Sequence, residues 1–429
     1  MTTRRPGTAP LGPRFVDRTV HRQWLLAQAQ SLFVLFQRNS LDPEGGFHTL
    51  ADDGTANAKS LRQLHDTCRM VHCFAIGHQL GLPGAERLVD HGMAFLWNSH
   101  RDTANGGYFW GVDATGPINP LKQAYGHAFV ILAASSARMV GHPDADRLLA
   151  DVVDVLLTRF WDAKAGATTE EYTADWQPLG TYRGQNSNMH LTEALMAAYE
   201  AFGQDRFLHM AESIADLFIQ RHARAQSWRV AEHFNANWQV DRDYAGDPMF
   251  RPSGTTPGHA LEWARLLVQL WELGGRTKPW MLEAAQGLFR KTTAIGWNAR
   301  TGGFYYTLGW DDHPDRADRY WWPCAEGIGA AAALATVCPD DPDFEIWYRR
   351  IWSFVDTHLI DHTHGGWFAE LDENLVRVSK VFHGKPDIYH ALQACLIPLL
   401  PANGSITRGL EGEGACNLLQ IRTAPHASQ

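Results

Sequence analysis

The segment Ile328–Val337 reads IGAAAALATV, and two others share its character: AYGHAFVILAASSARMV at Ala124–Val140 and IYHALQACLIPLL at Ile388–Leu400. Each has the length and residue types of a helix, yet each is apolar and rich in small residues around most of its circumference. A helix that has no polar face has to be buried on all sides. These segments therefore predict helices that lie inside the molecule.

A second kind of helical segment carries a charged face opposite an apolar one. DRFLHMAESIADLFIQRHA at Asp205–Ala223 and DFEIWYRRIWSFVDTHL at Asp343–Leu359 are two examples. Helices of this kind expose one face to solvent. The two kinds alternate along the chain, amphipathic helices at odd positions and apolar helices at even ones. We expect twelve helices, near residues 15–38, 58–81, 84–100, 120–141, 144–160, 187–203, 205–222, 256–274, 277–295, 318–337, 341–359 and 385–400.

A repeated motif divides the chain into six units. A glycine pair followed by an aromatic residue recurs about every sixty residues, with one longer step and a degenerate copy at Ala165-Gly166. Each copy opens a short alternating stretch that is typical of a strand or hairpin. Self-similarity at a fixed period is the signature of a repeat architecture. The four clear copies are Gly45-Gly46-Phe47, Gly106-Gly107-Tyr108, Gly302-Gly303-Phe304 and Gly365-Gly366-Trp367.

Six apolar helices enclosed by six amphipathic ones predict an all-α (α/α)6 barrel with short β-hairpins in its loops. We expect one barrel domain at residues 15–400, a flexible segment at 1–14 and a C-terminal tail at 401–429. A division into two domains is the alternative. It is disfavoured because no linker rich in proline, serine or glycine interrupts the pattern.

Composition narrows the classes of function. The net charge of −9 provides no basic stripe, so we expect no nucleic acid partner. No apolar run approaches the roughly 18 residues of a membrane span, and no signal for export is evident, so we expect a cytoplasmic protein. The 17 tryptophans and 21 histidines suit a sugar site, where indole rings cover C–H surfaces and imidazoles move protons near neutral pH.

Each apolar helix also carries polar or ionisable residues, mostly near its N-terminus. Charges in such helices are costly unless they are paired or functional. Parallel inner helices begin at one end of a barrel, so these residues predict a single pit at that end. The candidate site residues are Arg69, Tyr125, Asn186, His190, Glu193, His259, Glu262, Trp321, Trp322, Glu326 and His390.

Two histidines in this set have a glutamate three residues later, as His190–Glu193 and His259–Glu262. This spacing places a carboxylate and an imidazole on one helix face, which suits general acid–base chemistry. Di-iron bundles use the reverse order, Glu-x-x-His, together with further bridging glutamates. We therefore expect no metal and no other cofactor. The adjacent Trp321 and Trp322 suit a platform on which a sugar stacks.

The stretch SGTTPGHALEW at 253–263 resembles the signature of the N-acylglucosamine 2-epimerase superfamily. Other matches occur in the family's order and span nearly the whole chain, and they look most like the mannose isomerase and sulfoquinovose isomerase branch. They are Thr67-Cys68-Arg69-Met70, Asn188-Met189-His190 with Glu193, Trp321-Trp322 with Glu326, and Asp387-Ile388-Tyr389-His390.

This resemblance implies an aldose–ketose isomerase that interconverts D-mannose and D-fructose through a cis-enediol, without a metal. It implies that His390 moves the proton between C2 and C1. His259, oriented by Glu262, would serve ring opening and the enediol hydroxyls. His190, Arg69 and Glu326 would hold O1 and O2, and Tyr125, Asn186, Glu193 and the tryptophan pair would bind substrate.

Three alternatives stay open at this point. A sugar 2-epimerase and a sulfoquinovose isomerase belong to the same superfamily. An inverting glycoside hydrolase would need two facing carboxylates, for which Glu262 and Glu326 are candidates. The excess of histidine argues against the hydrolase, because hydrolysis does not need several imidazoles. The oligomeric state is open.

Overall fold

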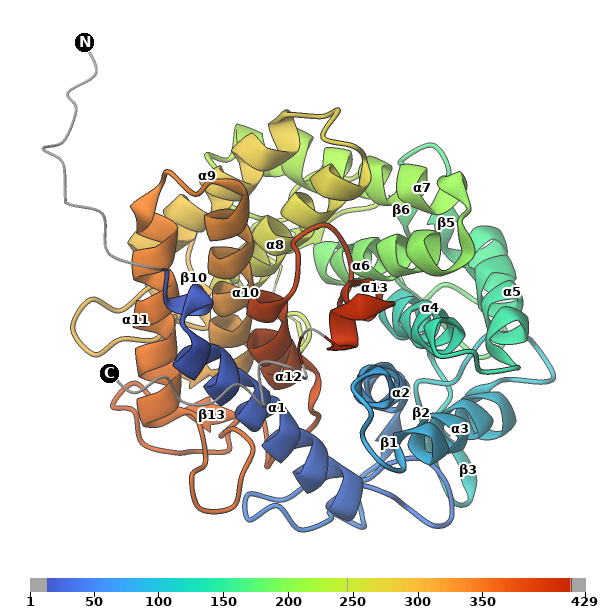
Figure 1. Cartoon of the computed structure of the whole chain (residues 1–429). Coiled ribbons are helices and arrows are strands. Elements are labelled where there is room, and N and C mark those ends of the chain that lie inside the picture. The colour runs from blue at the N-terminus through green and yellow to red at the C-terminus, as the bar shows by residue number, and fades with distance from the viewer. Residues whose placement is uncertain (1–13, 245, 417, 419–429) are drawn as a thin grey trace, which may run out of the picture.

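The computed structural model describes residues 14–244, 246–416 and 418. Six inner helices form a closed ring, in which each contacts the next and the last contacts the first (Figure 1). They are α2 Leu64–Gln79, α4 Ala124–Met139, α6 Gln185–Phe202, α8 Pro257–Leu273, α10 Trp321–Val337 and α12 Tyr389–Leu396.

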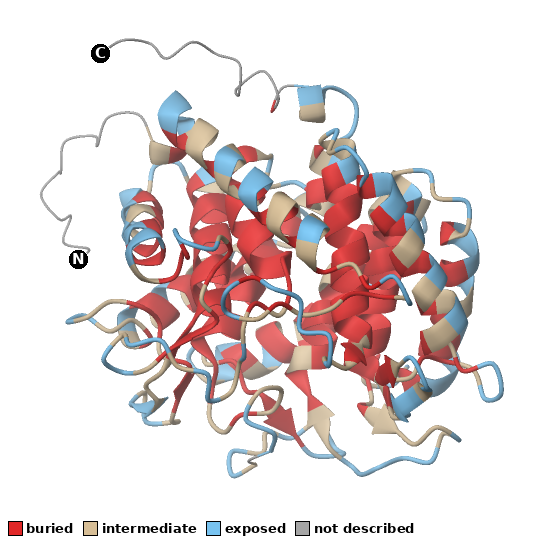
Figure 2. Cartoon of the chain, turned by 90° about the horizontal axis from the view of Figure 1, so that it is seen from below, coloured by how far each residue is buried: buried red, intermediate tan, exposed pale blue. Residues whose placement is uncertain are grey.

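Six outer helices pack around this ring, α1 against α12 and each of the others against the inner helix that precedes it. They are α1 Thr19–Asn39, α3 Ala85–Phe95, α5 Ala145–Val155, α7 Asp205–Ala215, α9 Trp280–Ile295 and α11 Pro342–His358. The predicted (α/α)6 barrel is confirmed. Figure 2 shows the reason for the two compositions, because the inner helices are buried around their circumference while the outer ones bury one face only.

Short strands form a second ring at the end of the barrel where the inner helices begin. The residues just before each inner helix pair with the loop that leads to the next inner helix. The last of these bridges joins Lys385, ahead of α12, to Leu50, ahead of α2, and so closes the circle. The strands are β1 Arg62–Gln63, β2 Gly111–Asp113, β3 Gly116–Asn119, β4 Lys122–Gln123, β5 Trp161–Asp162, β6 Ala167–Thr168, β7 Glu171–Tyr172, β8 Arg183–Gly184, β9 His233–Phe234, β10 Thr307–Leu308, β11 Pro314–Arg316, β12 Arg319–Tyr320 and β13 Glu370–Leu371.

This strand ring explains where the predicted helix boundaries are wrong. The helices expected from 58, 120, 318 and 385 begin at 64, 124, 321 and 389, because the residues ahead of them belong to strands, bridges and loops. At their other ends, α3, α5 and α7 run into π-helical turns at Leu96–His100, Leu156–Phe160 and Asp216–Ala223. Short 3-10 turns lie at Phe15–Asp17 and Ile397–Leu399.

The opposite end of the barrel is covered by the segment after α12. Its short helix α13, Ile406–Gly409, lies over the inner ring (Figure 1). Gln269 and Gln79 donate side-chain hydrogen bonds of 3.0 Å to the carbonyls of Gly404 and Thr407 in this segment. The expected domain limits stay a prediction, and residues 1–13 and 419–429 lie outside the described part of the chain. None of the described helices is both long and apolar enough to cross a membrane.

Candidate active site

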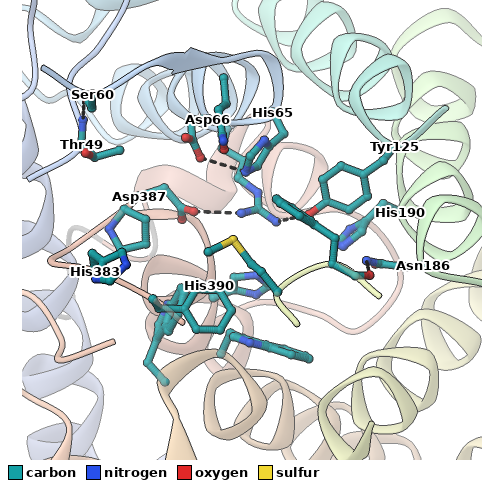
Figure 3. Close-up of a pocket in the computed structure, with 18 of the residues that line it drawn as sticks. Thr49, Ser60, His65, Asp66, Tyr125, Asn186, His190, His383, Asp387 and His390 are labelled. Carbon is teal, nitrogen blue, oxygen red and sulfur yellow. Dashed lines mark hydrogen bonds and ion pairs between the residues drawn. The ribbon is translucent and has the colours of Figure 1, made fainter. Parts of the chain in front are cut away.

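A pocket of about 270 Å³ lies at the end of the barrel where the inner helices begin. All six inner helices contribute side chains from their first two turns, and Figure 3 shows the labelled residues converging on one space. The N-termini of these helices carry partial positive charge, which favours negative charge that develops on a ligand. The inner-helix residues of the lining are His65, Asp66, Arg69, Tyr125, Asn186, His190, His259, Glu262, Trp321, Trp322 and His390.

Nine of the eleven predicted site residues are in this lining. The exceptions are Glu193 and Glu326, which were expected to touch substrate and instead lie behind the lining residues. Loops supply the rest of the wall, including Met249 and Phe250 on one side and Phe382, His383 and Asp387 on the other.

The partner of His259 is Glu232, which comes immediately before β9. The Nδ1 atom of His259 lies 2.9 and 3.0 Å from the two carboxylate oxygens of Glu232. Gln185 donates to the same carboxylate at 2.8 Å, and the backbone N–H of Thr256 donates at 3.2 Å. Burial alone would raise the pKa of Glu232, but the charge and hydrogen bond of His259 offset this, so that the pKa is lowered and the carboxylate is ionised.

This contact corrects the expectation that Glu262 orients His259. Glu262 is one turn deeper along α8, where its side chain meets α6, and its Oε1 lies 3.6 Å from Nδ1 of His190. His259 is in the first turn of α8 and therefore meets the loop that carries Glu232. The i, i+3 spacing predicts which helix face a pair shares, but the neighbouring elements decide what each side chain contacts.

His390 has a second buried carboxylate as its partner. Its Nδ1 lies 2.8 Å from Oε1 of Glu326, and Oε2 of Glu326 accepts a hydrogen bond of 3.0 Å from Nε of Arg265. Burial opposes ionisation of Glu326, but Arg265 and His390 together lower its pKa to about 2. Both catalytic candidates thus use Nδ1 for an ionised glutamate, which leaves Nε2 of each ring available to a substrate.

Arg265 links three glutamates at the floor of the pocket, of which Glu262 and Glu326 are buried. Besides Glu326, its guanidinium lies 3.3 Å from Glu193 and 3.5 Å from Glu262. Glu193 also accepts a hydrogen bond from the hydroxyl of Tyr389. Sequence analysis missed Arg265, although the signal that marked Arg69, a charge in an otherwise apolar helix, applies equally to it.

Glu262 and His190 differ from the two ionised pairs. Burial, reinforced by Glu326 and opposed by Arg265, raises the pKa of Glu262 well above its ordinary value. Burial and then the charges of Arg69, His390 and His259 lower the pKa of His190 far below its ordinary value. A protonated carboxyl and a neutral imidazole therefore face the pocket near pH 7. Oε2 of Glu262 and Nδ1 of His190 are buried without a hydrogen-bond partner in the structure.

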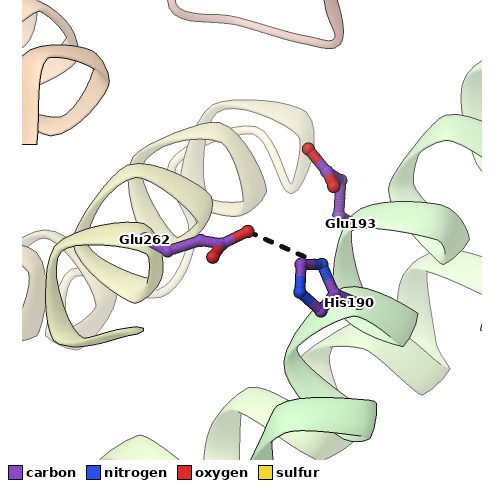
Figure 4. A group of neighbouring side chains, drawn as sticks. All are labelled: His190, Glu193 and Glu262. Carbon is purple, nitrogen blue, oxygen red and sulfur yellow. Dashed lines mark ion pairs between the residues drawn. The ribbon is translucent and has the colours of Figure 1, made fainter. Parts of the chain in front are cut away.

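His190, Glu193 and Glu262 are also the one group of described residues whose spacing could hold a metal ion, with their ligand atoms within 4.8 Å of one another (Figure 4). Their chemistry does not fit a metal well. Metal ligands have to be deprotonated, whereas burial favours the protonated form of Glu262. The guanidinium of Arg265 already supplies positive charge to both glutamates.

Arg69 is held in place by polar and aromatic neighbours. It donates to Asp387 at 2.8 Å and to the hydroxyl of Tyr125 at 3.1 Å, and its guanidinium lies 4.8 Å from the ring centre of Tyr389. Burial raises the pKa of Tyr125 to about 12, so this hydroxyl keeps its proton. Because it accepts from Arg69, Tyr125 can donate its own proton to a ligand.

Trp322 contacts both catalytic histidine candidates. Its ring centre lies 5.0 Å from that of His259 and 6.0 Å from that of His390. The ring fits because residue 258 is glycine: a Cβ atom there would lie 2.2 Å from Cζ3 of Trp322. This close approach is a physical reason for glycine in the Pro-Gly-His motif.

Known proteins are similar to this chain over most of its length. A family model described as N-acylglucosamine 2-epimerase matches residues 45–394. A D-mannose isomerase of Pseudomonas cannabina pv. alisalensis is 41% identical over 401 residues, covering 91% of this chain and 96% of that protein. A D-mannose isomerase of Thermobifida fusca is 40% identical over 403 residues, covering 92% and 98%. A crystal structure of a D-mannose isomerase has a TM-score of 0.84 and 33% identity, covering 90% of this chain and 99% of the other.

Proposed function

Since the chain belongs to the N-acylglucosamine 2-epimerase family, we propose that it is an isomerase that interconverts D-mannose and D-fructose. The observation that carries this proposal is the pair of histidines, His259 and His390, which face one pocket and each bind a buried, ionised glutamate through Nδ1. Two such imidazoles can accept and donate protons near neutral pH.

The reaction follows from these groups. His390 takes the proton from C2 of the open-chain aldose, and the electron pair of that C–H bond forms the C1–C2 double bond. The carbonyl oxygen at C1 gains a proton, which gives the cis-enediol. His390 then delivers to C1 the proton that it took from C2, and the hydroxyl at C2 loses its proton, which gives the ketose. His259 serves ring opening and the hydroxyl protons, and the helix N-termini stabilise charge on the enediolate oxygens.

The surroundings of the two glutamates support this division of roles. Arg265 donates a hydrogen bond to Glu326 and balances part of its negative charge. Glu232 instead accepts hydrogen bonds from the neutral side chain of Gln185 and from a backbone N–H. His390 therefore faces a carboxylate whose charge Arg265 partly balances, whereas no arginine or lysine hydrogen-bonds to the carboxylate beside His259 in the described residues. That asymmetry suits His259 as the proton donor and His390 as the base.

The lining favours a neutral sugar over one with an anionic C6 substituent. Among the described residues that line the pocket, Arg69 is the only lysine or arginine, and the carboxylate of Asp387 balances its charge at a distance of 2.8 Å. Asp66 is a further carboxylate in the wall. A sulfonate or phosphate at C6 would meet no lysine or arginine of this lining that lacks a carboxylate partner, which disfavours the sulfoquinovose alternative.

The hydrolase alternative has no support in the geometry. Glu262 and Glu326 both lie against Arg265, and Glu326 is behind His390. An inverting hydrolase needs an acid and a base on opposite sides of a glycosidic bond, about 6.5–9.5 Å apart. Two carboxyl groups that share one guanidinium do not provide that arrangement.

The test is product analysis with purified protein. D-Mannose should give D-fructose, and activity should survive treatment with EDTA. His390→Asn should abolish turnover, while mannose 6-phosphate should not react. Glucose as the dominant early product would support the 2-epimerase alternative, and absence of any ketose from unmodified hexoses would overturn the proposal. The cytoplasmic location stays a prediction.

A further inference from the structure

The segment after α12 covers the end of the barrel opposite the pocket, and three inner helices hold it there (Figure 1). We call residues 401–410 of this segment the C-terminal cap. Gln79 at the end of α2 and Gln269 near the end of α8 each donate a side-chain hydrogen bond of 3.0 Å to a carbonyl of the cap. Glu200, near the end of α6, accepts from the backbone N–H of Ser405 with both carboxylate oxygens at 3.1 Å. The cap is therefore anchored at several points of the inner ring.

One of these anchors also reaches the charges at the floor of the pocket. The Oε1 atom of Gln269 accepts a hydrogen bond of 3.3 Å from a terminal nitrogen of Arg265, one turn earlier on α8. Arg265 donates through Nε at 3.0 Å to Glu326, whose other oxygen lies 2.8 Å from Nδ1 of His390. Four hydrogen bonds in series thus connect the carbonyl of Gly404 in the cap to a histidine that lines the pocket.

This series of hydrogen bonds is buried along its whole length. All four of its side chains are more than nine-tenths buried. The cavity between the cap and the guanidinium is about 20 Å³, and its lining includes Arg265, Gln269 and Ser405. That volume has room for about one water molecule. Charges so far from bulk water interact more strongly than they would at a surface, so a small change in the position of Arg265 has a large electrostatic effect.

Arg265 has competing partners, and Gln269 helps to decide between them. The terminal nitrogen that binds Gln269 also lies 3.3 Å from Glu193, and the other terminal nitrogen lies 3.5 Å from Glu262. Nε is the atom that faces Glu326. If the amide of Gln269 were absent, the guanidinium would be free to turn toward Glu193. Arg265 would then balance less of the negative charge of Glu326.

The charged and titratable side chains that face Arg265 come from α2, α6, α8, α10 and α12. Besides the three glutamates, they include His72 of α2 and Tyr389 of α12. Burial, opposed by Glu193, lowers the pKa of His72 to about 4. Burial and then Glu193 raise the pKa of Tyr389 well above its ordinary value. Both side chains are therefore neutral near pH 7, which leaves Arg265 and the glutamates to set the charge at the floor of the pocket.

We propose that Gln269 is a positioning residue, which ties Arg265 to the C-terminal cap and so sets how much of the charge of Glu326 acts on His390. The inference rests on the proposed function, because it takes His390 as the group that moves the carbon-bound proton. None of the described residues of the cap lines the pocket. The cap therefore affects the reaction through Gln269 and not through contact with the substrate.

The test compares Gln269→Met and Gln269→Asn with wild type. In both variants kcat for D-mannose should fall about tenfold while KM stays within about threefold, because Gln269 does not touch the substrate. The acid limb of the kcat/KM profile should move to higher pH by about half a unit or more, because a less balanced Glu326 favours a protonated imidazole. Two variants guard against one that fails to fold, and thermal unfolding is measured for each.

Gln79→Met is the matched control. Gln79 donates to the cap at the same distance as Gln269, but it does not line the cavity that Arg265 lines. This variant should lower the melting temperature about as much as the Gln269 variants do, and it should keep the kcat and the pH profile of wild type. An equal change of the pH profile in Gln79→Met would overturn the inference, because any loosening of the cap would then have the same effect.

A second readout does not need turnover. Protein labelled with ¹⁵N-histidine is titrated by NMR, and His390→Asn identifies the ring signals of His390. Their midpoint should move to higher pH in both Gln269 variants and stay at the wild-type value in Gln79→Met. A midpoint that both Gln269 variants leave unchanged would contradict the proposal. If wild type forms no fructose, the proposed function fails, yet this titration still decides whether Gln269 acts on His390.

Discussion

Replacing Glu232 by glutamine removes the negative charge beside His259 and keeps the shape of the side chain. The carboxylate oxygens lie 2.9 and 3.0 Å from Nδ1, so the centres of charge in the ionised pair are about 4 Å apart. At an effective dielectric constant of about 20, such a pair interacts by about 4 kcal/mol. That energy corresponds to a factor of about one thousand in kcat/KM. The fall should be smaller than this, because the amide oxygen of glutamine still accepts a hydrogen bond from Nδ1–H. We therefore expect kcat/KM for D-mannose to fall about a hundredfold.

The assay is the initial rate of fructose formation from pH 5 to pH 9. The charge of His259 helps to lower the pKa of Glu232, so the ionised carboxylate and a protonated imidazole stabilise each other, and glutamine removes that coupling. If His259 acts as the proton donor, the alkaline limb of the kcat/KM profile should move toward acid in Glu232→Gln. Glu232→Asp, which restores the charge at a slightly greater distance, should recover part of the activity and move the limb back.

Thermal unfolding of each variant separates this effect from loss of fold, and Glu373→Gln is the control for an exposed glutamate. Activity of Glu232→Gln within threefold of wild type, with an unchanged pH profile, would refute the role given to the contact. A large loss of activity without any shift in the profile would mean that Glu232 only holds the ring in position.

Three other perturbations give distinct readouts. Glu262→Gln should keep kcat/KM within about tenfold of wild type, because the amide resembles the protonated carboxyl that burial favours, whereas Glu262→Ala should lose about a hundredfold. Gly258→Ala places a Cβ 2.2 Å from the Trp322 ring, so overpacking of about 1–3 kcal/mol should lower both kcat/KM and the melting temperature. Lys385→Met leaves Asp361 buried without its 2.9 Å partner and should reduce the free energy of unfolding in urea by about 3 kcal/mol. Burial opposes ionisation of Asp361, but Lys385 helps to lower its pKa to about 2. In wild type, the stability that this ion pair contributes is therefore present above about pH 4 and is lost as pH falls toward 2. The variant should not show this loss when its free energy of unfolding is measured over the same pH range.

The fold could be predicted because the two helix classes differ in composition over their whole length. A segment such as Ile328–Val337 has no polar face to expose, and six alternations of this kind allow few architectures. The helix starts could not be predicted as well. Lys122 and Gln123 have ordinary helix propensities, yet they form β4 because Glu171 and Tyr172 are available to pair with them. That pairing partner is about fifty residues away, beyond any local pattern.

The pocket lining was predictable for a similar reason, since polar residues near the start of a buried helix have only the end of the barrel to face. The carboxylate partners were not predictable. Glu232 is 27 residues before His259 and belongs to a loop without periodicity, so nothing local distinguishes it from the other acidic residues of the chain. Local spacing instead favoured Glu262, which the fold directs toward α6.

Depth along the inner helices explains why two predicted substrate contacts lie behind the pocket. Glu193 is three residues beyond His190 on α6, and therefore about 4.5 Å deeper in the barrel. At that depth Glu193 meets Arg265 on α8, as Glu326 does from α10. Glu193 and Glu326 do not line the pocket, but Glu326 lies 2.8 Å from Nδ1 of His390 and so places negative charge beside that imidazole. The first two turns thus line the pocket, while Glu193, Glu326 and Arg265 lie behind that lining and place charges next to it.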